Sequence, residues 1–319
     1  MNIIEVDNLT QDYGHGRGIF DVSFAVKKGE VFGFLGPNGA GKSTTIRHIM
    51  GFSKPKKGET RVFGLESFHN YYKILERVGY LPGEIALPEG LTGTDFIKMM
   101  GDLRRCKSDD MLNYLLQKFE LNPNIETKNM SLGDKRKLAI VAAFMNNPDV
   151  LVLDEPTSGL DPVMQQNFIE FIKEEKKKGK TILLSSHIFS EVEATCDRIA
   201  IIKDGRIVST FETNAIKHNQ NKSFEVYFNN EQELKEFVKN MPKAKIKVDT
   251  ILKYGISSVD EKNLKVIVCV QDKDINEVIL LMSKFKIKEF KQVEFTLQDY
   301  FMQFYYEDKN FKGALKWKK

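Results

Sequence analysis

The stretch Gly36-Pro-Asn-Gly-Ala-Gly-Lys-Ser-Thr44 decides how this chain folds. It matches the pattern GxxxxGK followed by Ser or Thr, and it lies between the apolar run Val31–Leu35 and a segment with helically spaced apolar residues. Glycines let the backbone turn sharply and present N–H groups to phosphate oxygens, and the N-terminus of the following helix adds partial positive charge. Lys42 would neutralise the β- and γ-phosphates of ATP, and the Ser43 hydroxyl would bind Mg²⁺. The residues predicted to contact the nucleotide here are Gly36, Pro37, Asn38, Gly39, Ala40, Gly41, Lys42, Ser43 and Thr44.

Two acidic residues and a histidine follow other apolar runs of the same kind. Asp154 and Glu155 come directly after Val150–Leu153, and His187 comes shortly after Thr181–Ser185. Because ligands bind at the carboxyl ends of the strands in open α/β sheets, these side chains should lie beside the phosphate loop. We expect Asp154 to hold Mg²⁺, Glu155 to act as the general base toward water, and His187 to contact the γ-phosphate.

The apolar runs before residue 211 predict a parallel sheet. Each is short and nearly continuous, which suits strands that are buried on both faces beneath helices. The pair Asp204-Gly205 between two further apolar runs predicts a tight hairpin. The expected core strands are 31–35, 150–153, 181–185, 199–203 and 206–210, and those of an antiparallel piece are 3–9, 20–27 and 58–64. The fold class is therefore α/β.

Two further regions complete the predicted organisation. Between Leu91 and Glu120 the pattern is helical, with Thr94 and Ser108 as expected caps, which predicts a helical subdomain over about residues 85–145. After about residue 211 a small α+β domain begins, with an alternation that ferredoxin-like units also show. Its expected elements are strands at 223–228, 264–270 and 288–293, and helices at 231–239, 274–284 and 297–306.

Composition excludes several classes of protein. The net charge of +4 and the pI of about 8.7 are too weak for a nucleic-acid footprint. No apolar run approaches the roughly 18 residues of a membrane-spanning helix, and the N-terminus lacks the features of a signal peptide. The three cysteines, Cys106, Cys196 and Cys269, are far apart and form no metal-binding pair. We therefore expect a soluble cytoplasmic protein.

Taken together, the ordered motifs resemble the P-loop ATP-binding cassette of ABC transporters, over residues 1 to about 215. Met130-Ser-Leu-Gly-Asp134 stands where the family signature belongs, and Ser158-Gly-Leu-Asp161 is similar to the loop that communicates across a dimer. His187 is similar to the switch histidine, and Tyr13 stands where the family stacks an aromatic ring on adenine. The chain would then comprise a cassette, 1–215, and a small C-terminal α+β domain, 216–319, with a regulatory or docking role.

The resemblance implies a head-to-tail dimer, either of two copies or of two different cassettes, with two ATP molecules at the interface. Each phosphate loop would face the signature of the other subunit, where Ser131 and Gly133 would contact the γ-phosphate. Ser131 can also cap the helix that follows it, and a helix N-terminus attracts anions.

The sequence departs from the family pattern in two places. Within the signature, Leu132 replaces a glycine and Asp134 replaces a glutamine, so a negative charge lies near a polyanion. In Gly79-Tyr-Leu-Pro-Gly-Glu84, Gly83 stands where the family has a glutamine that contacts Mg²⁺ and couples to the membrane subunit. Glu84 is a candidate substitute.

A single cassette followed by a domain of about 100 residues resembles the ATPase subunits of ABC-2-type exporters. Its membrane-spanning permease partner would be encoded separately and would hold it at the inner face of the cell membrane. One alternative is a soluble mechanical ATPase acting on ribosomes or DNA, although those relatives carry two cassettes or long coiled coils. The other is a nucleotide sensor with little turnover, against which Glu155 and His187 argue.

Overall fold

The structure, a computed structural model, describes residues 1–104, 109–214, 221–241, 246–247, 250–251, 255–271, 274–293, 297–298 and 301. Its contacts divide the chain into two compact units, Met1–Thr213 and Asn214–Lys319. Each unit is described by itself. Within the described residues, no helix combines the length and the apolar character that crossing a membrane requires.

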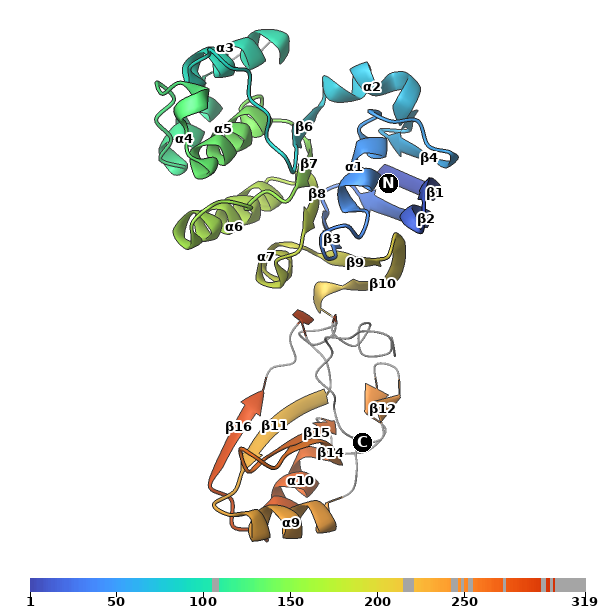
Figure 1. Ribbon diagram of the computed structural model, residues 1–319, viewed down its shortest axis with the longest axis vertical. Coiled ribbons are helices and arrows are strands. Elements are labelled where there is room, and N and C mark those ends of the chain that lie inside the picture. The colour runs from blue at the N-terminus through green and yellow to red at the C-terminus, as the bar shows by residue number, and fades with distance from the viewer. Residues whose placement is uncertain are drawn as a thin grey trace. The chain divides into compact units, whose positions relative to one another are not determined.

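A six-stranded sheet runs through the first unit in the order β10-β9-β3-β8-β7-β6 (Figure 1). Its strands are β3 (Val31–Leu35), β6 (Val78–Leu81), β7 (Val150–Asp154), β8 (Thr181–Ser186), β9 (Arg198–Lys203) and β10 (Arg206–Glu212). All neighbours pair in parallel except β10, which returns antiparallel to β9 through Asp204-Gly205, both at positive φ. Strands β3, β7 and β8 are buried at every residue. The predicted parallel core is thus confirmed.

Both faces of this sheet are covered (Figure 1). Helices α5, α6 and α7 lie on one side, and α1 and the antiparallel strands lie on the other. The bounds are α1 (Lys42–Ile49), α5 (Leu132–Phe144), α6 (Pro162–Lys177) and α7 (Phe189–Thr195). Helix α7 approaches so closely that a Cβ on Gly33 would lie 2.7 Å from Val192 Cγ1. On the opposite face, the rings of Phe32 and Phe34 each pack against Phe24 with centroids 5.1 Å apart.

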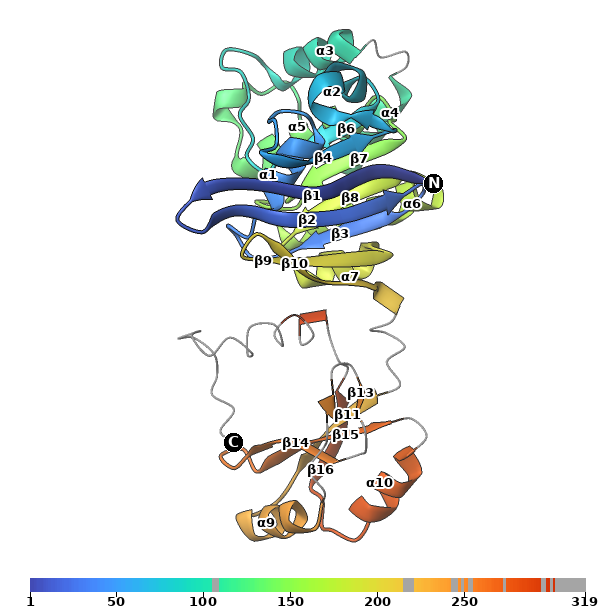
Figure 2. The same ribbon diagram turned by 90° about the vertical axis from the view of Figure 1, so that its right-hand side faces the viewer.

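A four-stranded antiparallel sheet, in the order β2-β1-β4-β5, shares a core with the larger sheet (Figure 2). Its strands are β1 (Asn2–Gly14), β2 (Arg17–Lys27), β4 (Lys57–Val62) and β5 (Leu65–Glu66), and α2 (Ser67–Leu75) follows them. The hairpin of β1 and β2 extends well beyond the predicted strands, to the pair Gly14 and Arg17. Its tip is largely exposed, so the apolar alternation that reveals a strand ends before the pairing does.

Three helices form the predicted helical region, α3 (Gly93–Arg104), α4 (Asp110–Lys118) and α5, with a short 3₁₀ turn, η1 (Thr127–Asn129), between the last two. The expected cap at Thr94 is wrong. Instead, Asp95 N donates to Thr92 Oγ1 (3.1 Å) and Thr92 N donates to Asp95 Oδ2 (3.0 Å), which is a capping box two residues earlier. The Thr94 hydroxyl donates to Asn124 Oδ1 (3.1 Å). Ser108 lies outside the described residues.

The second unit contains a four-stranded antiparallel sheet in the order β14-β15-β11-β16, and its core joins the inner strand residues to two helices. The elements are β11 (Asn221–Tyr227), α9 (Glu231–Asn240), β12 (Ile246–Lys247), β13 (Thr250–Ile251), β14 (Gly255–Asp260), β15 (Lys265–Gln271), α10 (Ile275–Met282) and β16 (Glu289–Val293). The four-stranded sheet and its helices follow the order β-α-β-β-α-β of a ferredoxin-like unit. Strand β14 was not predicted. Of the helix expected at 297–306, only residues 297, 298 and 301 are described.

Candidate functional site

The predicted phosphate loop leaves the carboxyl end of β3 and enters α1. Gly41 precedes α1 with φ at 108°, and a Cβ there would lie 2.5 Å from Ile19 Cγ2, so only glycine fits. It offers no side-chain acceptor to the first N–H groups of α1, which suits that end to an anion. At the start of the loop, Gly36 N donates to Ser186 O (3.3 Å), which ties the loop to β8.

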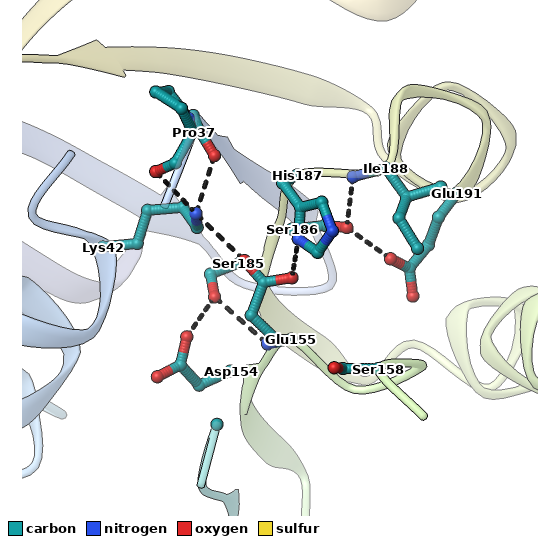
Figure 3. A network of polar contacts seen from close by, with 12 residues as sticks. Pro37, Lys42, Asp154, Glu155, Ser158, Ser185, Ser186, His187, Ile188 and Glu191 are labelled. Atoms are coloured by element: carbon teal, nitrogen blue, oxygen red, sulfur yellow. Dashed lines mark hydrogen bonds and ion pairs between the residues drawn. The ribbon is translucent and has the colours of Figure 1, made fainter. Parts of the chain in front are cut away.

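Lys42 is the charged residue of the loop, and it is buried at 5 % exposed. Its Nζ donates to Gly36 O (2.6 Å) and Pro37 O (3.1 Å), so the loop curls around the ammonium group. The same Nζ forms an ion pair with Glu155 Oε1 at 2.9 Å (Figure 3). The cation is therefore aimed at the end of β7, two strands away in the sheet.

Asp154 is the last residue of β7 and is 2 % exposed. Its Oδ1 accepts a hydrogen bond from the Ser185 hydroxyl of β8, which fixes the carboxylate (Figure 3). The other oxygen, Oδ2, faces the turn after β6, where a Cβ on Gly83 would lie only 2.9 Å away. The structure thus holds one buried carboxylate in a defined orientation at the carboxyl edge of the sheet.

Glu155 joins the loop to His187. Its backbone takes a left-handed conformation (φ 50°), which costs a non-glycine residue about 1 kcal/mol, and its N–H donates to Ser185 O (3.0 Å). The side chain is directed between two partners, with Oε1 at 2.9 Å from Lys42 Nζ and Oε2 at 2.6 Å from His187 Nδ1 (Figure 3). Strained backbone at the meeting point of three charged or titratable groups is typical of a functional site.

A second polar cluster lies behind His187 and was missed by the sequence reasoning. Ser186 Oγ donates to Glu191 Oε2 (2.5 Å) and accepts from Ile188 N (2.9 Å), so it holds both ends of the turn around His187 (Figure 3). Burial raises the pKa of Glu191, hydrogen bonds from Ser186 and Thr157 lower it, and the charge of Glu155 raises it; the resulting pKa is about 7. The sequence did contain a signal for this cluster. Two serines end an apolar strand, and a glutamate follows one helical turn after the histidine.

The signature segment is ordered around the start of α5. Ser131 is the helix cap: its Oγ accepts from Asp134 N (3.1 Å) and donates to Asp134 Oδ2 (2.7 Å). Gly133 lies against the 158–161 loop, because a Cβ there would be 3.3 Å from Gly159 O. Among the described residues, no hydrogen bond or ion pair joins Ser131 or Gly133 to the phosphate loop of the same chain.

The other residues predicted to contact the nucleotide differ in exposure. Ser43, Asn38 and Gly39 are exposed, whereas Ala40 is buried and its N–H donates to Pro37 O (3.2 Å). Thr44 is half-buried in the first turn of α1. Tyr13 lies near the tip of the β1–β2 hairpin, where it is 60 % exposed.

Comparisons with known proteins identify the family. A family model described as ABC transporter matches residues 19–158. An uncharacterized ABC transporter ATP-binding protein of Methanocaldococcus jannaschii is 35% identical over 210 residues, which are 64% of this chain and 76% of the relative. The chain belongs to the ABC transporter ATP-binding proteins. Its enzymatic class is accordingly that of the ABC ATPases.

Two further comparisons support this ABC cassette. The bacitracin transport ATP-binding protein of Bacillus licheniformis is 34% identical over 228 residues, covering 70% of this chain and 74% of the relative. A solved structure of an ATP-binding subunit of an ABC transporter aligns with a TM-score of 0.62 at 32% identity, covering 67% of this chain and 92% of that structure. These matches confirm the predicted fold class.

The structure shows what surrounds the two places where this ABC cassette departs from its family pattern. Leu132 is 64 % exposed and covers Gly159, where a Cβ would lie 2.9 Å from Leu132 Cγ. Gly83 lies so close to Asp154 that no side chain fits there without a shift. Glu84, the candidate substitute for the absent glutamine, is exposed.

Proposed function

We propose that this ATPase binds ATP with Mg²⁺ and cleaves its terminal phosphate to power a separately encoded membrane-spanning exporter. The single observation that carries the proposal is the contact of Lys42 with Glu155 at 2.9 Å. It brings the cation suited to a γ-phosphate and the carboxylate suited to a general base to one point, at the edge of the sheet where ligands bind.

The ion pair between Lys42 and Glu155 must break when the nucleotide binds. A γ-phosphate in the loop competes with Glu155 for Lys42, because both are anions and the ammonium group is 5 % exposed. Once the phosphate has taken Lys42, the Glu155 carboxylate is released from its cation. Released, its oxygen is free to accept a hydrogen bond from water. Binding of substrate thereby prepares the base.

The residues present also fit a magnesium ion. Mg²⁺ commonly takes one or two protein ligands together with phosphate oxygens and water. Asp154 is fixed through Oδ1 by Ser185 and keeps Oδ2 for another partner, and Ser43 is exposed at the first turn of α1. When bound there, the ion would neutralise charge on the β- and γ-phosphates.

The proposed hydrolysis uses these side chains in fixed roles. Glu155 accepts a proton from water while the water oxygen forms a bond to the γ-phosphorus. The bond between that phosphorus and the bridging oxygen breaks, and the electron pair leaves with ADP. Lys42 and the loop N–H groups stabilise the charge on the phosphoryl oxygens. His187, 2.6 Å from Glu155 Oε2, keeps the base oriented and reaches toward the γ-phosphate.

The proposal includes a dimer in which each site is completed by the other subunit. Ser131 and Gly133 lie at the start of α5, and the described residues give them no hydrogen bond or ion pair to their own phosphate loop. A second cassette, identical or different, would place them against the γ-phosphate, and Tyr13 would stack on adenine. We extend the proposal to a permease partner at the inner face of the cell membrane, as the transport names of the relatives suggest. The second unit would regulate or dock.

A matched pair of variants tests the proposal. Lys42→Ala should abolish Mg²⁺-dependent phosphate release by the purified protein and weaken ATP binding strongly. Lys118→Ala removes a different lysine whose ion pair, with Glu174, has the same 2.9 Å separation, so it should retain activity. Equal activity in wild type and Lys42→Ala would overturn the proposal. Identification of the membrane protein that copurifies from detergent-solubilised membranes tests the transport assignment.

A further inference from the structure

Arg136 joins three segments of the cassette that are far apart in sequence. It lies in the second turn of α5 and is 3 % exposed. Its three guanidinium nitrogens each donate to a backbone carbonyl: Nε to Ser158 O (2.9 Å), Nη1 to Pro82 O (3.0 Å) and Nη2 to Gly83 O (2.7 Å). One side chain therefore holds the turn after β6 and the loop after β7 to the helix of the signature.

This arrangement needs a planar group with several donors. A lysine has a single ammonium nitrogen, and it could not reach two separate loops in the fixed directions that a guanidinium offers. Burying a cation is costly, and desolvation lowers the pKa of Arg136, although the charges of Asp154 and Glu155 offset part of that effect. Among the described residues no carboxylate lies within ion-pair distance of it, so its direct partners there are carbonyl dipoles.

Both loops held by Arg136 adjoin the two acids of the site. A Cβ on Gly83 would lie 2.9 Å from Asp154 Oδ2, so the position of this turn sets the space on one side of that carboxylate. On the other loop, Ser158 N donates to Glu155 O (3.1 Å), which closes the turn that begins at Glu155. A displacement of either carbonyl would therefore reach Asp154 or Glu155 directly.

We propose that Arg136 is a positioning residue that locks the Pro82-Gly83 turn and the Ser158 loop against α5, and so sets the geometry of Asp154 and Glu155 for hydrolysis. The inference rests on the ATPase function proposed above. Because Ser131 caps α5, these hydrogen bonds also link the signature segment of a subunit to the acids of its own site. Its effect falls on turnover, since none of the three carbonyls belongs to the phosphate loop.

The test compares Arg136→Met with Lys180→Met. Lys180 is also buried, at 6 % exposed, and also holds a carbonyl, Pro148 O at 2.7 Å, but at the opposite edge of the sheet. Arg136→Met should lower kcat at least tenfold while the dissociation constant for ATP stays within about threefold, and Arg136→Lys should be intermediate. Lys180→Met should leave both quantities near wild type. Gly83→Ala, which crowds Asp154 without touching α5, should reproduce the loss of kcat.

Hydrogen exchange in the absence of nucleotide separates this inference from the ATPase proposal. Backbone amides of residues 83–85 and 157–160 should exchange at least tenfold faster in Arg136→Met than in Lys180→Met, whether or not the protein hydrolyses ATP. The ATPase proposal would be refuted if wild-type protein hydrolysed ATP no faster than Lys42→Ala. Unchanged exchange in these two loops, or equal kcat in Arg136→Met and wild type, would overturn the role of Arg136.

Discussion

Replacing Glu191 with glutamine should remove a large part of the pH dependence of the stability of the cassette. Burial raises the pKa of this carboxyl group from its ordinary value of 4.5 to about 7. Between these values the unfolded chain releases the proton while the folded chain retains it. The stabilisation is therefore fully present below about pH 4.5 and is lost as the pH rises to about 7.

The size of this effect follows from the same gap. About 2.5 pH units, at about 1.4 kcal/mol per unit, correspond to about 3 to 4 kcal/mol in the free energy of unfolding. Glu191 is 1 % exposed, so solvent screening removes little of it. Glu191→Gln keeps the shape and stays neutral, and it should lose less stability than wild type between pH 5 and pH 7.5.

Urea unfolding followed by circular dichroism at several pH values measures this difference. Subtracting the variant's free energy of unfolding from that of wild type at each pH cancels the contributions of the other titrating groups. The unfolding transition that the substitution shifts is the one that belongs to the cassette. Glu193→Gln, at a half-exposed glutamate on the same helix, is the matched control and should keep the wild-type slope. Parallel pH profiles for wild type and Glu191→Gln would refute the reasoning, because they would mean that Glu191 does not hold its proton in the folded state.

Three other predictions concern the site and its surroundings. A mixture of Lys42→Ala and Ser131→Arg subunits should regain phosphate release relative to either variant alone, because one of the two sites in a mixed dimer carries neither defect; no gain at any mixing ratio would count against shared sites. Glu84→Ala should reduce ATPase activity in the presence of the membrane partner if this exposed side chain couples the two proteins, and unchanged stimulation would show that it does not. A chain ending at Asn214 should bind ATP, as measured by calorimetry, with an affinity within about threefold of the full chain, since the phosphate loop and both acids lie within Met1–Thr213; a folded truncation that fails to bind would place part of the nucleotide site in the second unit.

The sequence predicted the core of the fold because its main elements carry local signals. The phosphate loop is contiguous, and its glycines are required where the backbone has a positive φ or meets a neighbour, as at Gly41. Strands buried on both faces stand out as apolar runs, and this placed Asp154 and Glu155 at the correct edge of the sheet. Elements without such signals were misjudged, including the exposed tip of the β1–β2 hairpin and the cap at Thr92.

The contacts that organise the site could not be predicted in the same way. Arg136 donates to the backbone carbonyls of Pro82, Gly83 and Ser158. Every residue has such a carbonyl, so the residue types at these positions do not reveal the contacts. The ion pair of Lys42 with Glu155 joins residues that are distant in sequence, and it depends on the order of strands in the sheet. Neither the strand order nor these contacts follow from a motif.

The substitution Glu155→Gln tests the central claim most directly. Glutamine has a similar shape but cannot accept the proton of water as a carboxylate does, and it removes the anion that competes for Lys42. In a single-turnover measurement with Mg²⁺ and labelled ATP, the variant should bind ATP at least as tightly as wild type. It should release phosphate at least a hundredfold more slowly and accumulate as an ATP-bound dimer, most clearly in complex with its membrane partner. Phosphate release at the wild-type rate would contradict the account, because the base would then lie elsewhere.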